Sequence, residues 1–388
     1  MKSLKINGFK CFDEVILPLS NLTLLTGFNA AGKSTLIQSI LLMSQAVKYG
    51  NNTPEILLNG PIVNLGSPSD VFHQSKNDVE GKGEKLSFSF EFDDCYLEWK
   101  FKYPKKKDYP VLSLSSFFYH EADKNVLNSE SSGTLRELVP DFCRQKITTL
   151  DNLVYLSACR LGAVDVYPIP SDFKYSATNV GVQGEFAAWL MEQNKDEDIP
   201  EARSNKKDLA LTLRRQVNAW LSYILPNAEA DTKNIDKASL VQLLFRNDGI
   251  SEWRRPANIG YGLTYVFPIL VAGLLAKENQ ILVIDSPEAH LHPLGQSRIG
   301  EFLATIAASN VKVIIETHSD HILNGIRLAV NDRIIASTKV GIHFFENNNN
   351  NKKTNVISPQ IDESGNLSEW PEGFFDQSDK DLGKLIGW

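Results

Sequence analysis

The sequence predicts an α/β fold built on a mixed sheet, with an antiparallel β lobe and a helical insertion. Two short apolar strands at residues 281–284 and 311–315 are separated by an amphipathic helix at 299–308, the pattern of a parallel βαβ unit. Polar and apolar side chains alternate with a period of two over residues 86–103, as in antiparallel strands with one wet face. Apolar residues recur every three or four positions between 184 and 223, which indicates helices.

The amino-acid composition is that of a folded globular protein with a mildly acidic net charge. The 388 residues are 42% hydrophobic and 22% charged, close to globular averages, and the net charge is −7. This acidic balance excludes a surface dominated by positive charge, so a DNA contact would need a local basic patch such as residues 100–107. That run equally fits a solvated hairpin.

Neither a membrane span nor a cysteine framework is expected. The four cysteines are far apart and form no CxxC pair, so no disulfide scaffold or thiolate zinc site is predicted. The longest apolar run, at residues 266–276, is too short to cross a bilayer. The first residues lack an apolar signal core, so we expect a soluble cytoplasmic protein.

The strongest motif is a phosphate loop at residues 27–34. Gly-Phe-Asn-Ala-Ala-Gly-Lys-Ser fits GxxxxGK[ST] at every fixed position, between a predicted strand at 22–26 and a predicted helix at 34–47. The glycines let successive N–H groups turn toward an anion, Lys33 reaches the β- and γ-phosphates, and the Ser34 hydroxyl ligates Mg²⁺. The alternative is a glycine-rich turn that only caps a core helix. The context predicts a P-loop NTPase.

A predicted strand at residues 281–284 is followed by a carboxylate, and α/β sheets bind ligands at the carboxyl ends of their strands. Residues 281–284 are apolar and Asp285 follows them, so Asp285 is the predicted Walker B acid that holds magnesium; alternatively it only caps the next element. The strand at 313–315 leads to His318, the position of a switch histidine that would bond the γ-phosphate and position water.

These motifs, in this order, resemble the ABC-class ATPases of the RecF and SMC kind. The closest resemblance is to short ATPases similar to the ATPase half of OLD (overcoming lysogenization defect) nucleases and to the ATPase subunits of Septu-like antiviral systems. It is carried by Ile6-Asn-Gly-Phe-Lys-Cys-Phe12, residues 27–35, Asn258-Ile-Gly-Tyr-Gly-Leu-Thr264, Ile284-Asp-Ser-Pro-Glu-Ala-His-Leu-His-Pro293, Glu316-Thr-His-Ser-Asp320 and Trp370-Pro-Glu-Gly-Phe-Phe-Asp376.

The resemblance implies a single ABC-type ATPase head over residues 1–388, which divides into five parts. These are an N-terminal part with the phosphate loop (1–84), an antiparallel β lobe (85–155), a helical insertion (156–250), a lobe with the signature, Walker B and switch histidine (251–346) and a C-terminal extension (347–388).

The resemblance also implies that two heads sandwich two ATP molecules. Residues 258–264 would be the signature segment that meets the γ-phosphate across the dimer, although a turn leading into a core helix is the alternative. The segment lacks the usual serine–glycine–glycine run, so Asn258 or Thr264 would have to supply the polar side chain.

A serine occupies the place of the usual catalytic glutamate. Ser286 directly follows Asp285, and a serine cannot act as a carboxylate base at neutral pH. Glu288, two residues later, is the predicted substitute. Slow hydrolysis with a structural Glu288, or a base supplied from elsewhere, stays open.

The expected site therefore has three sets of residues. Nucleotide binding is assigned to Gly27, Asn29, Ala30, Ala31, Gly32, Lys33, Ser34, Thr35, Asn258, Gly260 and Gly262, catalysis to Glu288, His318 and Lys33, and magnesium binding to Ser34 and Asp285. The cofactors expected are ATP and Mg²⁺.

Three further signals are weaker. His290, His292, His318 and His321 with Glu288 suggest a transition-metal cluster, but no third ligand arrives at a recognisable spacing. Gln74 is either a magnesium contact or a surface glutamine. Arg160 is either a phosphate contact in trans or part of a salt bridge.

Three functions follow from this pattern. The first is an ATPase whose ATP-dependent self-association, as a homodimer or higher oligomer, gates a separate effector such as a nuclease or toxin in prokaryotic defence, because no Toprim or HNH nuclease pattern is found in the chain. The second is a RecF-like repair ATPase that binds DNA directly. The third is a non-hydrolysing ATP-sensing scaffold, suggested by Ser286.

Overall fold

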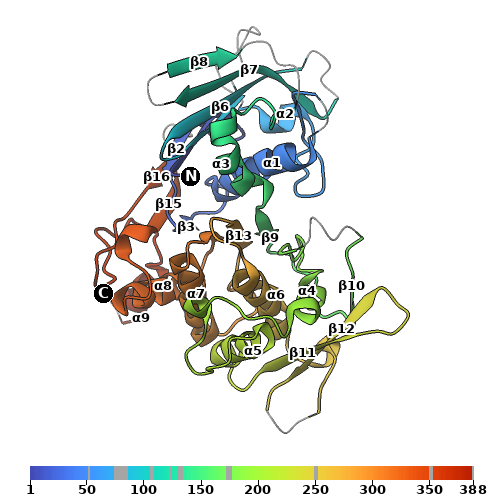
Figure 1. Cartoon of the computed structure of the whole chain (residues 1–388). Coiled ribbons are helices and arrows are strands. Elements are labelled where there is room, and N and C mark those ends of the chain that lie inside the picture. The colour runs from blue at the N-terminus through green and yellow to red at the C-terminus, as the bar shows by residue number, and fades with distance from the viewer. Residues whose placement is uncertain are drawn as a thin grey trace. The chain divides into compact units, whose positions relative to one another are not determined.

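The computed structural model describes residues 1–50, 53–73, 86–104, 109–121, 124–128, 134–171, 177–248, 252–348 and 353–386. The chain divides into two compact units (Figure 1). The first comprises Met1–Ser20, Gly27–Leu153 and His343–Ser358, and the second Asn21–Thr26, Val154–Ile342 and Pro359–Trp388.

The first unit contains an antiparallel sheet with the order β2-β1-β5-β6-β7-β4, with β8 paired to β7. Its strands are β1 (Ser3–Phe9), β2 (Phe12–Pro18), β4 (Glu55–Leu57), β5 (Leu86–Glu91), β6 (Cys95–Lys102), β7 (Val111–Glu121) and β8 (Lys124–Asn128). The antiparallel lobe predicted from the period-two pattern is confirmed at β5, β6 and β7. The N-terminal hairpin β1–β2 joins it through the pairing of β1 with β5.

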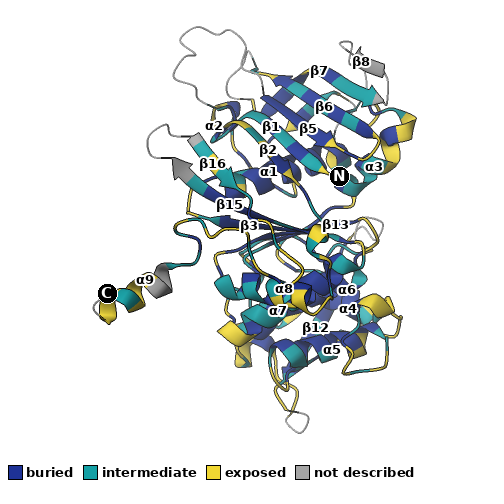
Figure 2. Cartoon of the chain, turned by 90° about the vertical axis from the view of Figure 1, so that its left-hand side faces the viewer, coloured by how far each residue is buried: buried dark blue, intermediate teal, exposed yellow. Residues whose placement is uncertain are grey.

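Helices α1 (Lys33–Tyr49), α2 (Pro68–Val71) and α3 (Asp141–Asp151) complete this unit. Most of α1 is buried, as its colouring in Figure 2 shows. The Ser44 hydroxyl at its centre donates to the main-chain oxygen of Leu150, 2.6 Å away, which joins α1 to α3. The helix that follows the phosphate loop is therefore anchored along its length.

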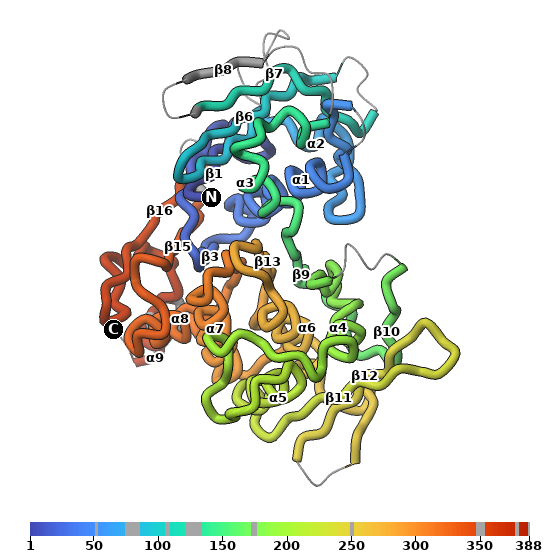
Figure 3. Tube along the Cα trace, viewed as in Figure 1, coloured from blue at the N-terminus to red at the C-terminus, as the bar shows by residue number. Residues whose placement is uncertain are grey.

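The second unit is organised around parallel strands. β9 (Val154–Leu156), β13 (Ile281–Asp285), β14 (Lys312–Glu316) and β3 (Leu22–Gly27) are parallel neighbours within a six-stranded sheet of order β16-β15-β3-β14-β13-β9. β15 (Val340–Asn348) and β16 (Lys353–Ile357), most of whose residues belong to the first unit, pair antiparallel, so the sheet is mixed, as predicted. Figure 3 shows β3, near the start of the chain, beside strands that come more than 250 residues later.

The second unit also contains six helices among its described residues. They are α4 (Ala187–Asn194), α5 (Leu213–Ile224), α6 (Tyr261–Leu275), α7 (Pro293–Ala308), α8 (Asp320–Asn331) and α9 (Gln377–Leu385), with short 3₁₀ turns η1 (Glu201–Arg203), η2 (Pro256–Asn258) and η3 (Ser337–Lys339). Of these helices, α6 contacts β13 and α7 contacts β14. The predicted helices between 184 and 223 are α4 and α5. The same unit contains a three-stranded sheet of order β10-β12-β11. Its strands are β10 (Val166–Pro168), β12 (Leu240–Arg246) and β11 (Glu229–Asn234). β11 was not predicted, because its sequence is almost wholly polar.

Helices α7 and α8 approach closely through two glycines. A Cβ atom at Gly325 would lie 1.9 Å from the main-chain oxygen of Ser297, and one at Gly300 would lie 2.5 Å from that of Ile322. Both positions therefore require glycine for steric reasons. This contact holds α8, which begins two residues after His318.

The aromatic C-terminal segment packs on α8. Phe374 is buried, its ring lies 5.1 Å from that of Trp370, and the Arg327 guanidinium lies 5.4 Å from the Trp370 ring centre. A free solvated tail is therefore excluded, as the sequence predicts. Among the described residues, no helix is both long and apolar enough to span a bilayer.

Replacing Gly325 by alanine should lower the free energy of unfolding by about 1–3 kcal/mol or more, because the new methyl group overlaps main-chain atoms of α7. Gly383 in α9 is the matched control, since a Cβ there meets nothing within 4 Å. Gly383→Ala should change stability by less than about 1 kcal/mol, in the stabilising direction. Thermal and urea unfolding measure both, and equal midpoints for the two variants would contradict the packing argument.

Candidate functional site

The phosphate loop of the first unit has three residues with positive φ. Gly27 has φ 123°, Ala30 58° and Gly32 112°. A Cβ at Gly27 would lie 2.1 Å from the main-chain oxygen of Phe345, so this glycine is required both by its backbone angle and by its neighbour. Such a sequence of backbone angles turns successive N–H groups toward one point, which is the geometry that binds anions.

Lys33 closes over this loop. Its side chain is 3% exposed, and its ammonium donates to the main-chain oxygens of Gly27, 3.0 Å away, and Phe28, 2.8 Å away. A buried ammonium is costly unless it is bonded, so these carbonyls fix its position over the loop.

The amino end of α1 fits a negatively charged group. The N-cap is Gly32, no side chain among the described residues caps the helix, and no acidic residue lies in its first turn. The positive end of the helix dipole therefore favours a negatively charged group at this end. Of the remaining predicted loop residues, Asn29 and Ser34 are exposed, Thr35 is half-buried and Ala31 is buried. The residues present fit a triphosphate.

In the second unit, the carboxyl ends of parallel strands align. Asp285 at the end of β13 is in register with Glu316 at the end of β14, and Glu316 is in register with Leu25 of β3. The Thr317 N–H donates to the main-chain oxygen of Leu25, 3.0 Å away. Two carboxylates therefore share one edge of the sheet, and the chain leaves that edge at Thr26 directly into the phosphate loop.

Glu288 joins the two strand ends beyond this edge. Its Oε1 accepts the main-chain N–H of His318, 2.9 Å away, across 30 residues of sequence. Its Oε2 is buried and has no hydrogen-bond partner among the described residues. One oxygen is thus held in place, while the other is enclosed without a hydrogen-bond partner among the described residues. The His318 residue itself is exposed.

The turn that carries Glu288 is conformationally strained. Ser286 has φ 48° and His290 φ 62°, angles that cost a non-glycine residue about 1 kcal/mol or more each. The Ser286 hydroxyl donates to the Asp285 carboxylate, 2.9 Å away, and the Ser286 N–H to the Glu316 main-chain oxygen, 2.8 Å away. Ser286 therefore orients the Asp285 carboxylate.

The sequence did not predict that Arg160 bonds main-chain oxygens, or that Glu316 lies beside Asp285 at the end of its strand. Arg160 is 6% exposed and donates to the main-chain oxygens of Asp285, 2.7 Å away, and Ser286, 3.2 Å away. These bonds go to main-chain oxygens and not to a carboxylate, so they differ from the salt bridge that the sequence suggested; the phosphate contact in trans stays a prediction. Burial lowers the pKa of Arg160 to about 10, although the nearby Asp285 and Glu288 carboxylates oppose that shift. Burial and the same carboxylate edge raise the pKa of Tyr155 on β9.

The predicted signature segment lies at the start of α6. Gly260 is the N-cap of the helix and is exposed, and Asn258 is exposed at the end of η2. A Cβ at Gly262 would lie 3.0 Å from the main-chain oxygen of His290, so this segment contacts the Glu288 turn. Thr264 is buried and its hydroxyl donates to the Tyr261 main-chain oxygen, 2.8 Å away, which leaves Asn258 as the polar candidate.

The histidines do not form a metal site. No group of three or more His, Cys, Asp or Glu side chains suited to a metal ion occurs among the described residues. His290 instead contacts two tyrosine rings, the His292 side chain accepts the Leu294 N–H at the start of α7, and His321 lies 3.7 Å from Asp320. Gln74 lies outside the described residues.

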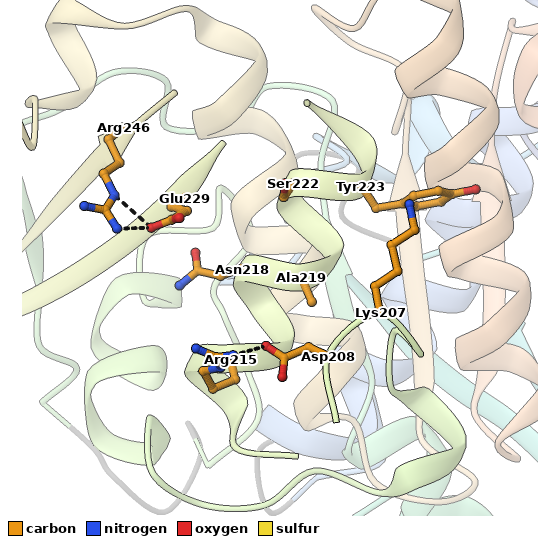
Figure 4. Close-up of a pocket in the computed structure, with 9 residues that line it drawn as sticks. All are labelled: Lys207, Asp208, Arg215, Asn218, Ala219, Ser222, Tyr223, Glu229 and Arg246. Carbon is orange, nitrogen blue, oxygen red and sulfur yellow. Dashed lines mark hydrogen bonds and ion pairs between the residues drawn. The ribbon is translucent and has the colours of Figure 1, made fainter. Parts of the chain in front are cut away.

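A separate pocket of about 400 Å³ lies beside α5 (Figure 4). Its charged groups are paired with one another: Arg215 bonds Asp208, 2.8 Å away, and Arg246 bonds Glu229. Lys207 lies over the Tyr223 ring, 5.0 Å from its centre. None of the predicted site residues lines this pocket.

Comparisons with known protein families match successive parts of the chain. Residues 1–155 match the family described as "AAA ATPase domain", and residues 149–324 match "AAA domain, putative AbiEii toxin, Type IV TA system". Residues 335–385 match "Protein of unknown function (DUF3696)". No curated protein matches the chain in sequence.

Solved structures give the fold. The Smc head bound to the C-winged helix domain of ScpA matches with a TM-score of 0.55 at 13% identity, over 94% of this chain and 98% of that one. The Smc head with an extended coiled coil, bound to the C-terminal domain of ScpA derived from Pyrococcus furiosus, matches with a TM-score of 0.55 at 12% identity, over 99% of each chain. The chain therefore has the fold of these Smc heads. The predicted P-loop NTPase fold is thereby confirmed.

The structure thus groups the predicted residues within each unit. The loop residues 27–32, which we call the nest, lead directly into the amino end of α1 and have positive φ at Gly27, Ala30 and Gly32. The Phe28 N–H donates to the Phe345 main-chain oxygen, 3.0 Å away. Asp285, Glu288 and the His318 main chain lie together at the ends of β13 and β14, with the start of α6 against the same turn.

Replacing Gly27 by alanine should weaken MgATP binding by at least about tenfold, because its Cβ overlaps the Phe345 main chain and displaces the nest. Ala30→Gly is the matched control: it removes a left-handed alanine, so it should keep affinity within about threefold and should not lower the unfolding midpoint. Titration with a fluorescent ATP analogue and thermal unfolding measure both effects. Equal affinities of G27A and the wild type would contradict this account of the loop.

Proposed function

We propose that this chain is an ATP-hydrolysing head whose ATP-dependent dimerisation gates a separate effector, a nuclease or toxin, in a prokaryotic antiviral defence system. The proposal of hydrolysis is supported by the position of the Glu288 carboxylate. Its Oε1 accepts the His318 N–H, and its Oε2 is buried without a partner among the described residues. A carboxylate held in this way is oriented to accept a proton from an attacking water.

The roles of the loop residues follow from their chemistry. The nest at Gly27–Gly32 and the amino end of α1 would hold the β- and γ-phosphates, and Lys33 would exchange its carbonyl partners for phosphate oxygens. Asn29, Ala30 and Ala31 would bind through their place in this nest, and Thr35 through its place in the first turn of α1.

The acidic edge supplies the remaining chemistry. Ser34 and Asp285 would hold Mg²⁺, which neutralises charge on the phosphates when it is bound. Glu288 would orient and deprotonate the water, and His318 would hydrogen-bond the γ-phosphate from the end of β14. Ser286 follows Asp285 directly, where the resembled ATPases have their catalytic glutamate. Its hydroxyl would instead orient the Asp285 carboxylate, to which it donates a hydrogen bond.

Dimerisation is supported by the exposed start of α6. Asn258 and Gly260 are exposed, no acidic residue lies in the first turn, and no side chain among the described residues caps the helix. We infer that this surface, with Gly262, meets the γ-phosphate of a nucleotide bound to a second copy.

The defence role is supported by one comparison, since residues 149–324 match a family whose description includes a toxin system. Copurification of the native chain and identification of the bound protein test it: a nuclease or toxin is expected. Salt-sensitive DNA binding by the isolated chain, with ATPase stimulated by DNA, would instead favour a RecF-like repair ATPase.

Glu288→Gln should lower kcat by about 100-fold or more while MgATP affinity stays within about threefold, because the amide oxygen can still accept the His318 N–H but cannot take a proton. Phosphate release and nucleotide titration measure the two effects. Lys33→Ala should lower affinity as well, and Glu278→Gln, on the surface, is the matched control.

A wild-type rate in E288Q would rule out Glu288 as the base. ATP-locked oligomers of the wild type without turnover would instead favour a non-hydrolysing scaffold.

Gly260→Ala should keep the wild-type unfolding midpoint, since a Cβ there meets nothing within 4 Å and the φ of −63° suits alanine. The added methyl group should nevertheless weaken ATP-dependent dimerisation by about tenfold, because it faces the nucleotide of the other copy. Light scattering with E288Q as the background measures this. Unchanged dimerisation would remove Gly260 from the signature role.

A further inference from the structure

Arg160 holds the turn that presents Glu288. After β9 ends, its guanidinium donates through Nη2 to the Asp285 main-chain oxygen, 2.7 Å away, and through Nη1 to that of Ser286, 3.2 Å away. These two successive carbonyls lie where the pairing of β13 with β14 ends. A planar guanidinium can bond both at once, which an ammonium cannot do with the same geometry.

Tyr265 of α6 completes this arrangement. The Arg160 guanidinium carbon lies 5.6 Å from the centre of the Tyr265 ring. The same ring meets the His290 ring edge-on, with centroids 4.5 Å apart, and Tyr261, one helical turn earlier, lies 5.7 Å from His290. The Ser286 end of the turn is thus held by Arg160 and the His290 end by two tyrosines of the signature helix.

This arrangement resists the strain at both ends of the turn. Ser286 and His290 both adopt positive φ, and such residues persist only where surrounding contacts over-determine them. Burying a guanidinium is destabilising unless its hydrogen bonds compensate, and Nε has no partner among the described residues. An apolar side chain would fill this space without that penalty, so packing alone does not explain an arginine here.

We propose that Arg160 and Tyr265 are positioning residues of the hydrolytic site, which hold the turn from Asp285 to His290 so that Glu288 stays aligned with the His318 N–H. They also connect that alignment to α6, so that a contact made by the signature segment acts on Glu288 in the same chain. The inference rests on the proposed function in that Glu288 is the base.

The test compares Arg160→Met, Tyr265→Leu and Tyr265→Phe with the wild type. Arg160→Met removes the donors at similar length, Tyr265→Leu removes the ring, and Tyr265→Phe keeps the ring and loses only the hydroxyl. Arg255→Met, which removes an exposed ion pair to Asp165, is the control. Amide hydrogen exchange over residues 285–291 is measured without nucleotide, and kcat and MgATP affinity are measured separately.

In R160M and Y265L we expect exchange over residues 285–291 to accelerate by about tenfold and kcat to fall by at least about tenfold, with MgATP affinity within about threefold. Y265F and R255M should match the wild type in all three. Wild-type exchange in R160M, or equal behaviour of Y265F and Y265L, would overturn the proposal.

Failure of the proposed function gives a different result. If the wild type shows no Lys33-dependent hydrolysis, the proposed function fails, while the exchange measurement still decides whether Arg160 and Tyr265 hold the turn. If the wild type hydrolyses ATP and R160M does so at the same rate, the positioning role fails alone. Should R160M not fold, the Tyr265 pair decides in the same way.

Discussion

The parallel register of β3, β14 and β13 is the constraint on which the site depends. Parallel strands bring their carboxyl ends to one edge of a sheet, and here the register aligns Leu25, Glu316 and Asp285. The Glu288 turn leaves β13 and His318 follows β14, so a shift of register between these two strands would move Glu288 relative to the His318 N–H.

In both the phosphate loop, which follows β3, and the Glu288 turn, which follows β13, a buried cation bonds two successive main-chain oxygens. In the phosphate loop, buried Lys33 bonds two successive carbonyls, those of Gly27 and Phe28. In the Glu288 turn, buried Arg160 bonds the successive carbonyls of Asp285 and Ser286. Carbonyls just beyond a strand end have lost their sheet partners, and a cation satisfies two of them at once. Both cations are buried. Under the proposed function the lysine would exchange its carbonyls for phosphate oxygens, whereas the arginine would keep its carbonyls and hold the turn.

Much of the site could be predicted where its chemistry is local in sequence. The glycines at 27 and 32 were expected from the motif, and their positive φ values agree with it. The Glu288–His318 bond could not be predicted, because it joins residues 30 positions apart through a strand register. The role of Arg160 was missed for a related reason: its partners are main-chain oxygens more than 120 residues away, and these leave no trace in side-chain identity.

The sequence by itself determined the phosphate loop, the apolar strands β3, β13 and β14, and the acids and histidine that follow them, since each depends on side chains near one another in the chain. Tertiary structure alone decided which oxygen of Glu288 is held, that Thr264 is buried while Asn258 is exposed, and that α6 contacts the Glu288 turn through Tyr265 and His290. These outcomes depend on backbone register and on packing between distant segments, which residue patterns do not encode.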